Sequence, residues 1–391
     1  MITVDEARAR LLELATPMPV EEVPLAQASG RVLARDVAAR RDQPPFAASS
    51  MDGYAVKSAE VELHAMFKLI GEAAAGRRFT GRVGPGQAVR IFTGAPMPEG
   101  ADFVVIQEDV SHSGDLVTIV NDPGTKDNVR PAGVDFRAGD GVSAPRLLRP
   151  ADIALLAAMN IARVPVARKP VVALISNGDE LVMPGEDPGP DQILSSNTFG
   201  LKAMLEALGV EARILPIARD TLSSLGTAFG LAEGADLVVT IGGASVGDHD
   251  LVGRVAGELG LERSFYKVLM RPGKPLMAGR MNGAAMVGLP GNPVSAMVCG
   301  HIFLAPMIRA MLGIGAKAPA LLRAPLAQAI AANGPREHYM RAKIGGDGRI
   351  TLSGDQDSSL LSVLSASNAL IRRPPGDPAQ AAGDLVDYLP I

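Results

Sequence analysis

The stretch VVTIGGASVGDHD, residues 238–250, indicates most directly what kind of fold this chain adopts. It begins as an apolar run rich in β-branched residues, which is typical of a buried strand, and breaks at Gly242 and Gly243. Asp248 and Asp250 follow, one on each side of a histidine. In open α/β sheets, ligands bind beyond the carboxyl ends of the strands. The stretch therefore predicts a strand that ends at a ligand, although two glycines are equally consistent with a plain tight turn.

Strands and helices alternate on both sides of this stretch. Leu201, Met204, Leu205 and Leu208 have the i, i+3, i+4, i+7 spacing of a helix, whereas the neighbouring strands are continuous apolar runs. Such alternation is typical of a parallel α/β sheet covered by helices on both faces. The pattern predicts strands at 171–176, 211–218 and 236–241, helices at 197–209, 221–233 and 250–260, a hairpin turning at Asn282 and Gly283, and a helix at about 293–312.

The remaining sequence has a different texture. Residues 1–14 have one apolar helical face with Thr3 or Asp5 as the cap, and a further helix begins at Pro150. Between these helices lie short alternating runs with many Gly, Pro and Asp residues, which predict an inserted β-rich module. The segment after Ala318, with a hairpin at 341–354, predicts a small β domain.

Composition narrows the possible functions. The chain has 391 residues, of which 47% are hydrophobic and 4% aromatic, and its net charge is −4. Few aromatic residues and no basic excess argue against nucleic-acid binding. Cys299 is the only cysteine, which excludes an internal disulfide and a thiolate zinc site. Acidic and arginine residues interrupt the N-terminal apolar residues, and we expect a soluble, cytoplasmic protein.

Acidic residues follow three successive predicted strands. Asp179 and Glu180 follow the first strand, Asp220 follows the second, and the pair at 248 and 250 follows the third. Asp220 and Asp250 could each serve only as a helix cap. Oxygen ligands without cysteine suit Mg²⁺, which is typically bound by one or two carboxylates together with substrate phosphates. The three clusters together favour a metal-bridged phosphate.

Basic residues and prolines follow in the next loops. Lys267, Arg271 and Lys274 lie in a segment stiffened by prolines, which favours an anion site over a solvated loop. Pro290 and Pro293 fix a turn before a helix whose free N–H groups could bind the same anion. In the β-rich module, Asp52 and Thr93 each lie next to a glycine, and composition alone predicts turns there.

Together these segments resemble a known family, the molybdopterin molybdenumtransferases, which includes the C-terminal domain of gephyrin. The resemblance spans nearly the whole chain, and an ordered set of motifs is far more specific than any one of them. The segments are, in order, SSMDGYAV, IFTGAPMPEGADFVVIQED, GVDFRAGD, ISNGDEL, GGASVGDHD, RPGKP and LPGNPVSAM.

The resemblance implies an elongated homodimer of α/β multidomain subunits in which the active site is shared between the two subunits. The implied parts are a discontinuous helical linking domain (1–20 and 140–165), an inserted β-rich domain (21–139), a parallel-sheet molybdopterin-binding α/β domain (166–316) and a small C-terminal β-barrel (317–391).

The implied activity is insertion of molybdate into adenylylated molybdopterin with release of AMP and with Mg²⁺ assistance. The resemblance further implies hand-over from a molybdopterin adenylyltransferase, delivery to acceptor molybdoenzymes, and no nucleic-acid or membrane partner. The implied catalytic residues are Glu180, Asp52, Thr93 and Asp135, the metal ligands are Asp220 and Asp250, and the substrate-binding residues are Gly242, Gly243, Ser245, Lys267, Arg271, Lys274, Pro290, Pro293, Arg341 and Ser358.

The sequence departs from the family pattern at a few positions. Asn177 stands where the family often has Thr, Arg271 where it has Lys, and His249 where it has Tyr. Because Arg and Lys differ in donor geometry, the anion contact at Arg271 is open. Two alternatives follow: an adenylyltransferase, which would need only the α/β part, and a scaffold that keeps the fold and binds a partner peptide.

Overall fold

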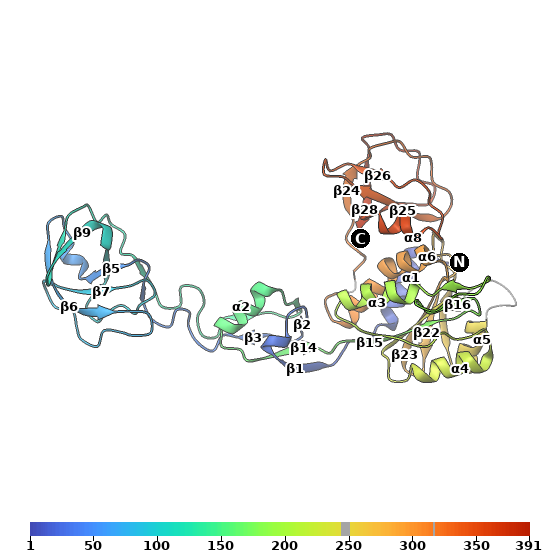
Figure 1. Cartoon of the computed structure of the whole chain (residues 1–391), viewed down its shortest axis with the longest axis horizontal. Coiled ribbons are helices and arrows are strands. Elements are labelled where there is room, and N and C mark those ends of the chain that lie inside the picture. Colours follow the sequence, from blue (N-terminus) through green and yellow to red (C-terminus); the bar gives the residue numbers. More distant parts are fainter. Residues whose placement is uncertain (244–250, 316) are drawn as a thin grey trace.

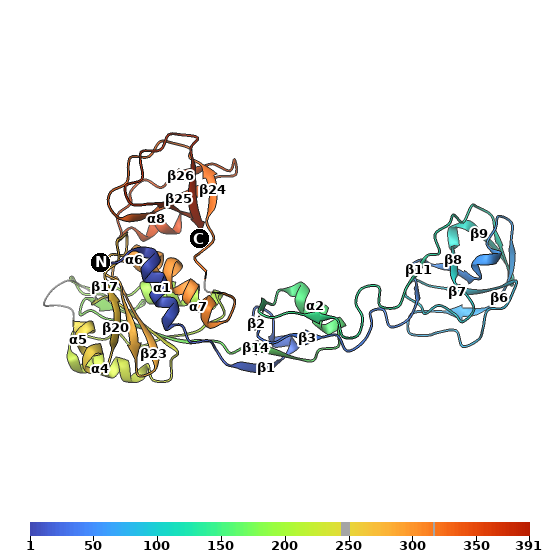
Figure 2. The same cartoon turned by 180° about the vertical axis from the view of Figure 1, so that it is seen from behind.

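The computed structural model describes residues 1–243, 251–315 and 317–391. The chain is elongated, with a distal β part at one end, a narrow central part, and an α/β part that carries the C-terminal β part at the other end (Figures 1 and 2). The chain runs from the α/β part out to the distal part and then back. The outgoing and returning segments lie side by side and form three pairs of short antiparallel strands. The pairs are β1 (Val20–Pro24) with β14 (Arg163–Ala167), β3 (Val37–Ala38) with β12 (Gly141–Val142), and β4 (Ala48–Ser49) with β11 (Val129–Arg130).

The α/β part is built on one mixed sheet of six strands. Four neighbouring strands are parallel, as the continuous apolar runs predict, and an antiparallel hairpin extends the sheet. The hairpin turns at Asn282 and Gly283, which both have positive φ, so this prediction is confirmed. In sheet order the strands are β18 (Glu211–Ile214), β15 (Val171–Ser176), β19 (Leu237–Ile241), β23 (Ala284–Leu289), β22 (Met277–Met281) and β20 (Glu262–Tyr266).

Helices cover both faces of this sheet. Alternate residues of β15 point to opposite faces, so Leu174 joins one core and Ile175 the other. The first core contains α3 (Asn197–Ala207), α6 (Pro293–Cys299) and α7 (Ala305–Met311), and the second contains α4 (Leu222–Leu231) and α5 (Leu251–Glu258). The predicted helices are confirmed within a few residues at each end.

The segment Pro293–Met311 forms one long helix, interrupted by a π-helical turn at Gly300–Leu304. Its length and hydropathy would suffice for a membrane span, but 72% of its most apolar window is buried inside the protein. It therefore serves as the core helix of the α/β part.

Helix α1 (Val4–Leu14) is capped by Thr3, whose side chain accepts a hydrogen bond from Glu6 N at 3.1 Å. Its apolar residues Val4 and Leu11 are buried in the core of the α/β part. We expected residues 1–20 to form a helical domain with residues 140–165, but α1 packs against the α/β part instead. An amphipathic pattern shows that a helix face is buried but not which element buries it.

The central part consists of short strands around α2 (Pro150–Ala158). It has its own small core, which includes Leu33, Leu156 and Val164. Helix α2 begins with a proline at its first position, as predicted. Strands β2 (Val32–Leu33) and β13 (Arg146–Leu147) complete the sheet formed with β1 and β14.

The distal part is a sheet of six strands with a separate core on each side, so its central strands are buried on both faces, which an alternating pattern does not predict. In sheet order the strands are β8 (Phe103–Ile106), β5 (Gly53–Val56), β7 (Gln87–Ile91), β6 (Met66–Ala73), β10 (Leu116–Ile119) and β9 (Val110–Ser113).

The C-terminal part is a β domain tied to the α/β part by strand β21 (Met270–Arg271), which pairs with its first long strand. The predicted hairpin at 341–354 is confirmed by the pairing of β25 with β26. The remaining elements are β24 (Leu322–Pro325), β25 (Glu337–Ile344), β26 (Ile350–Leu352), α8 (Leu361–Ser365), β27 (Ala369–Arg373) and β28 (Leu385–Pro390).

Candidate active site

The topology of the α/β sheet indicates where a ligand binds. Strand β15 lies between β18 and β19, and it is parallel to both. After β15 the chain forms β18 on one side and then crosses to form β19 on the other side. Ligands of open α/β sheets bind at such a switch point, beyond the carboxyl ends of the strands. Asn177, which follows β15, and Gly242, which follows β19, mark this place.

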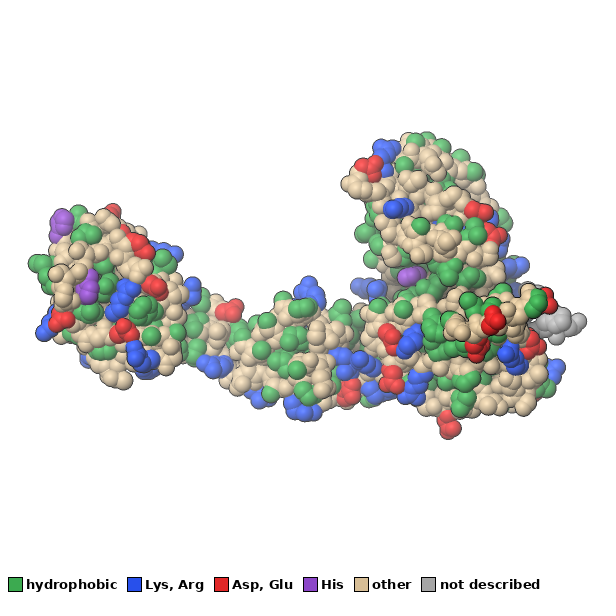
Figure 3. Space-filling model, viewed as in Figure 1, with side chains coloured by type: hydrophobic (Ala, Val, Ile, Leu, Met, Phe, Trp, Pro, Cys, Tyr) green, Lys and Arg blue, Asp and Glu red, His purple; other side chains and the backbone are tan. Residues whose placement is uncertain are grey.

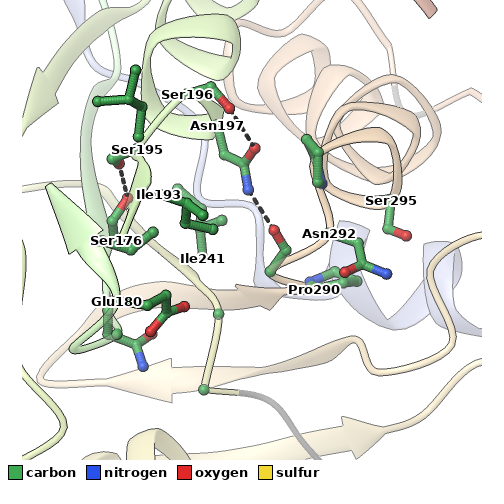
Figure 4. A pocket seen from close by; sticks show the side chains of 18 of the residues that line it. Ser176, Glu180, Ile193, Ser195, Ser196, Asn197, Ile241, Pro290, Asn292 and Ser295 are labelled. Atoms are coloured by element: carbon green, nitrogen blue, oxygen red, sulfur yellow. Dashed lines mark hydrogen bonds between the residues drawn. The ribbon is translucent and has the colours of Figure 1, made fainter. Parts of the chain in front are cut away.

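A cavity of about 1000 Å³ opens there (Figure 4). Its lining comes from the loops after β15, β18 and β19, from β17 (Ile193–Leu194), and from the loop at 290–293. Ser359 and Leu361 of the C-terminal part complete the wall. The view shows Glu180 on one side of the cavity and Pro290 and Asn292 on the other. The lining combines apolar side chains with a few polar groups, which is typical of a small-molecule site.

Two of the predicted acidic residues, Glu180 and Asp220, line this cavity. Gly178 has a φ of 148°, and a Cβ there would lie 2.4 Å from Glu180 Oε2, so the loop needs a glycine to let this carboxylate fold back. Asp179 instead has a structural role, because its Oδ1 accepts a hydrogen bond from Asp220 N at 3.1 Å. Of the acids that follow the three strands, Glu180 and Asp220 thus line the same cavity.

Asn177 connects the strand ends at the base of the cavity. Its side chain is buried, and Nδ2 donates to Asp220 Oδ1 at 3.3 Å. Within the described residues its Oδ1 has no hydrogen-bond partner. The departure from the family pattern therefore places an amide directly against a candidate metal ligand.

The glycines after β19 have a packing role that the sequence did not reveal. Both have positive φ, and a Cβ on Gly243 would lie 2.4 Å from Val252 Cγ2 and 2.5 Å from Asn177 Nδ2. We expected the N–H of Gly242 to bind a phosphate. It is instead engaged in the sheet, since Gly242 N donates to Leu289 O at 3.1 Å. Ser245 and Asp250, which we also predicted in this loop, lie outside the described residues.

The loop at 290–293 borders the cavity and connects helix α3 with the C-terminal part. Asn197 Nδ2 donates to Gly291 O at 2.7 Å, and Asn292 Nδ2 donates to Ser358 Oγ at 2.8 Å. Pro290 and Pro293 both line the cavity. The predicted Ser358 thus fixes the C-terminal part against the rim of the cavity.

The predicted basic residues Lys267, Arg271 and Lys274 lie outside the cavity lining, although Pro275 belongs to it. Lys267 Nζ lies 4.8 Å from the centroid of the Tyr266 ring. The side chain of Lys274 is exposed, and its carbonyl accepts hydrogen bonds within its own loop. Arg271 pairs in register with His338 of strand β25. The three residues therefore lie outside the lining of the cavity that contains Glu180 and Asp220.

Arg341 and His338 are both buried in strand β25, and His338 pairs in register with Arg271. Arg341 is 2% exposed, and its guanidinium donates to the carbonyls of Asp357 at 2.6 Å and Asp355 at 3.3 Å. Burial and the neighbouring arginines lower the pKa of His338 to about 4. We did not predict His338, although the arginines around it in PREHYMRA were a signal.

Asp52 and Thr93 lie together, but in the distal part. Asp52 Oδ1 accepts hydrogen bonds from Thr93 N at 2.7 Å and from Thr93 Oγ1 at 2.8 Å. These bonds, with a smaller contribution from Arg90, lower the pKa of the Asp52 carboxyl. Asp135 is placed elsewhere, where its N–H donates to Gln43 O at 3.0 Å on the strands that lead into the distal part.

The donor set can be compared with the needs of Mg²⁺. Among the described residues no three His, Cys, Asp or Glu side chains cluster as a complete metal site. Mg²⁺ commonly keeps several waters and uses one or two carboxylates with substrate phosphates. Asp220 and Glu180 on one cavity fit that pattern, since all their ligand atoms are oxygens.

The fold and the cavity define a class: a multidomain protein whose α/β module carries a cavity at the switch point of its sheet. Comparisons with known proteins give the family. Three family models match in succession: the MoeA N-terminal region (domains I and II) at residues 2–160, a probable molybdopterin-binding domain at 173–310, and the MoeA C-terminal region (domain IV) at 323–391.

Whole-chain relatives agree with these matches. The chain is 35% identical to a molybdopterin molybdenumtransferase of Nostoc over 97% of this chain and 91% of the relative. It is 37% identical to the one of Haemophilus influenzae over 80% of this chain and 78% of the relative. A crystal structure of a molybdopterin biosynthesis MoeA protein from Pyrococcus horikoshii superposes with a TM-score of 0.86 at 29% identity, covering 100% of this chain and 99% of that chain. This chain belongs to the molybdopterin molybdenumtransferase family.

Proposed function

We propose that this protein inserts molybdate into adenylylated molybdopterin and releases AMP, a step of molybdenum cofactor biosynthesis. The observation that carries the proposal is the cavity at the switch point, where Glu180 and Asp220 come together in a chain of this family. A cavity of about 1000 Å³ is large enough for a drug-sized ligand, and its position suits a phosphate-bearing one.

Glu180 is our candidate for proton transfer. When two dithiolene sulfurs replace oxo ligands of molybdate, the departing oxygens need protons to leave as water. The Glu180 side chain is exposed and lines the cavity, so its carboxylate can exchange protons with solvent and with a bound oxyanion.

Asp220 is our candidate for holding Mg²⁺, together with Asp250. When bound, Mg²⁺ would offset the charge of the phosphates as AMP departs. The amide of Asn177 orients the Asp220 carboxylate through the hydrogen bond at 3.3 Å. Ser358 is bonded to Asn292 at the edge of the cavity, and Lys267, Arg271, Lys274 and Arg341 stay candidates for holding oxyanions.

We further propose a homodimer with shared sites. Asp52 and Thr93 lie in the distal part, far from the cavity of their own chain (Figure 1). The molecule is hollowed between the distal part and the C-terminal part, which leaves room for a second copy (Figure 3). In this arrangement Asp52, Thr93 and Asp135 of one subunit would complete the cavity of the other.

The proposed setting follows from the reaction. The adenylylated substrate must come from an adenylyltransferase, and the finished cofactor must pass to acceptor molybdoenzymes. We place these steps in the cytoplasm.

A single-turnover assay tests the proposal. Purified protein is mixed with adenylylated molybdopterin, Mg²⁺ and micromolar molybdate, and AMP release and reconstitution of a cofactor-free molybdoenzyme are followed. We expect molybdate-dependent AMP release. Glu180→Gln should slow it by about 100-fold or more while binding of the adenylylated substrate persists, because the amide cannot carry the proton.

Glu13→Gln is the matched control, since Glu13 is exposed on α1 and lies outside the cavity lining. Binding of the adenylylated substrate without either product would contradict the transferase and point to a scaffold. ATP-dependent transfer of AMP without molybdate would identify an adenylyltransferase instead.

A further inference from the structure

Arg90 of strand β7 lies at the centre of a small cluster in the distal part. Its guanidinium carbon is 4.9 Å from the ring centroid of Tyr54 and 4.9 Å from that of Phe92. Tyr54 is the direct cross-strand neighbour of Arg90 in the β5–β7 pair, so the backbone also brings the two side chains together. Stacking between two rings limits the guanidinium to one orientation.

The same guanidinium makes two hydrogen bonds in different directions. Nη1 donates to Gly53 O at 3.3 Å, and Nη2 donates to Gln107 Oε1 at 2.6 Å. Gln107 in turn donates its backbone N–H to Asp52 O at 3.1 Å. Arg90 therefore contacts Gly53, which follows Asp52, and Gln107, which donates a hydrogen bond to the Asp52 carbonyl.

Thr93 is fixed through its neighbour in the same way. Phe92, which packs on Arg90, directly precedes Thr93, and Thr93 donates two hydrogen bonds to the Asp52 carboxylate. Arg90 thus contacts the carbonyl of Gly53, which follows Asp52, and the ring of Phe92, which precedes Thr93. The hydrogen bonds to the Asp52 carboxylate come from Thr93.

We infer that Arg90 is a positioning residue that fixes the Asp52–Thr93 pair in the orientation in which it faces the partner subunit's cavity. The inference rests on the proposed function, in which that pair completes a shared site. A lysine cannot replace Arg90, because an ammonium supplies the charge but neither the planar stacking surface nor the forked donors.

The test is a double-mutant cycle in the single-turnover assay. We expect Arg90→Gln and Arg90→Lys each to lower kcat by about 10-fold, with KM changed less than about 2-fold, since the substrate is held mainly in the partner's cavity. In an Asp52→Asn background, Arg90→Gln should have almost no further effect, because its target has already been removed.

Arg82→Gln is the matched control, since Arg82 lies in the same part, is 73% exposed and has only a long ion pair to Glu99 at 3.6 Å. Thermal unfolding of each variant shows whether the distal part is intact. If Arg90→Gln fails to fold, Gln107→Ala removes one partner of Arg90 and should give a smaller loss of kcat with the same dependence on Asp52.

Three results would overturn the inference: wild-type kcat in folded Arg90→Gln, full rescue by Arg90→Lys, or an equal loss in the Asp52→Asn background. Failure of the proposed function is distinguishable. If the transferase function fails, the wild-type protein itself shows no molybdate-dependent AMP release, and if only the shared site fails, Asp52→Asn and Thr93→Ala leave that release unchanged.

Discussion

At the scale of single residues, His338 of the C-terminal part is buried near four arginines. His338 is 7% exposed and faces Arg271, Arg336, Arg341 and Arg373, so protonation would add a further positive charge to a buried cationic group. Its pKa of about 4 in the folded protein lies below the ordinary value of 6.5. The folded state therefore keeps this side chain neutral at pH 7.

This neutrality predicts a pH-dependent stability. Above pH 6.5 the histidine is neutral in both states, and as the pH falls from 6.5 towards 4 only the unfolded state gains the proton, so folding is weakened. Between pH 7.5 and pH 5, the free energy of unfolding of the wild type should fall by about 1–2 kcal/mol more than that of His338→Gln. Urea titrations at both pH values measure this difference. His112→Gln is the control, since His112 is exposed in the distal part. Equal losses in wild type and His338→Gln would show that His338 is not kept neutral.

At the scale of elements, the loop after β19 depends on the absence of side chains. Gly243 has a φ of 62° and packs against Val252 and Asn177, whereas Gly230 lies in α4 with nothing within 4 Å of an added Cβ. The same substitution should thus have opposite effects at the two sites. One position needs a glycine for its conformation and packing, and the other only bears the entropic disadvantage of a glycine in a helix.

Gly243→Ala should lower the free energy of unfolding by about 1–3 kcal/mol, because both the backbone conformation and the contact with Asn177 would be strained. Gly230→Ala should raise it by about 0.5–1 kcal/mol through helix propensity. Urea denaturation of the two variants beside wild type measures both changes. A Gly243→Ala protein as stable as wild type would contradict the close packing at the switch point.

The α/β elements could be predicted because their signals are local. Continuous apolar strands and the spacing of Leu201 and Leu205 are contained in short segments, and so is the turn at Asn282. The acids at the strand ends could be predicted to meet because parallel strands share one carboxyl edge. The engagement of the Gly242 N–H with Leu289 could not, since it depends on which strand becomes the neighbour of β19.

At the scale of the whole molecule, the decisive contacts join distant parts of the chain. Val20 pairs with Ala167, and α1 is buried beside the long helix at 293–311. Periodicity shows that a strand or a helix face is covered but not by which partner, so these contacts could not be inferred from residues alone. The Asp52–Thr93 pair lies far from the cavity of its own chain, as the family resemblance implied, and we propose that a second subunit brings the two together (Figure 1).

Subunit complementation tests this arrangement most directly. Asp52→Asn and Glu180→Gln proteins, each expected to be strongly slowed but still measurable in molybdate-dependent AMP release, are refolded together, and the mixed dimers are isolated with two different affinity tags. One site of each mixed dimer would combine an intact cavity with an intact Asp52, so we predict about half of the wild-type turnover. Mixed dimers that are folded and bind the adenylylated substrate but stay inactive would contradict a site shared between subunits.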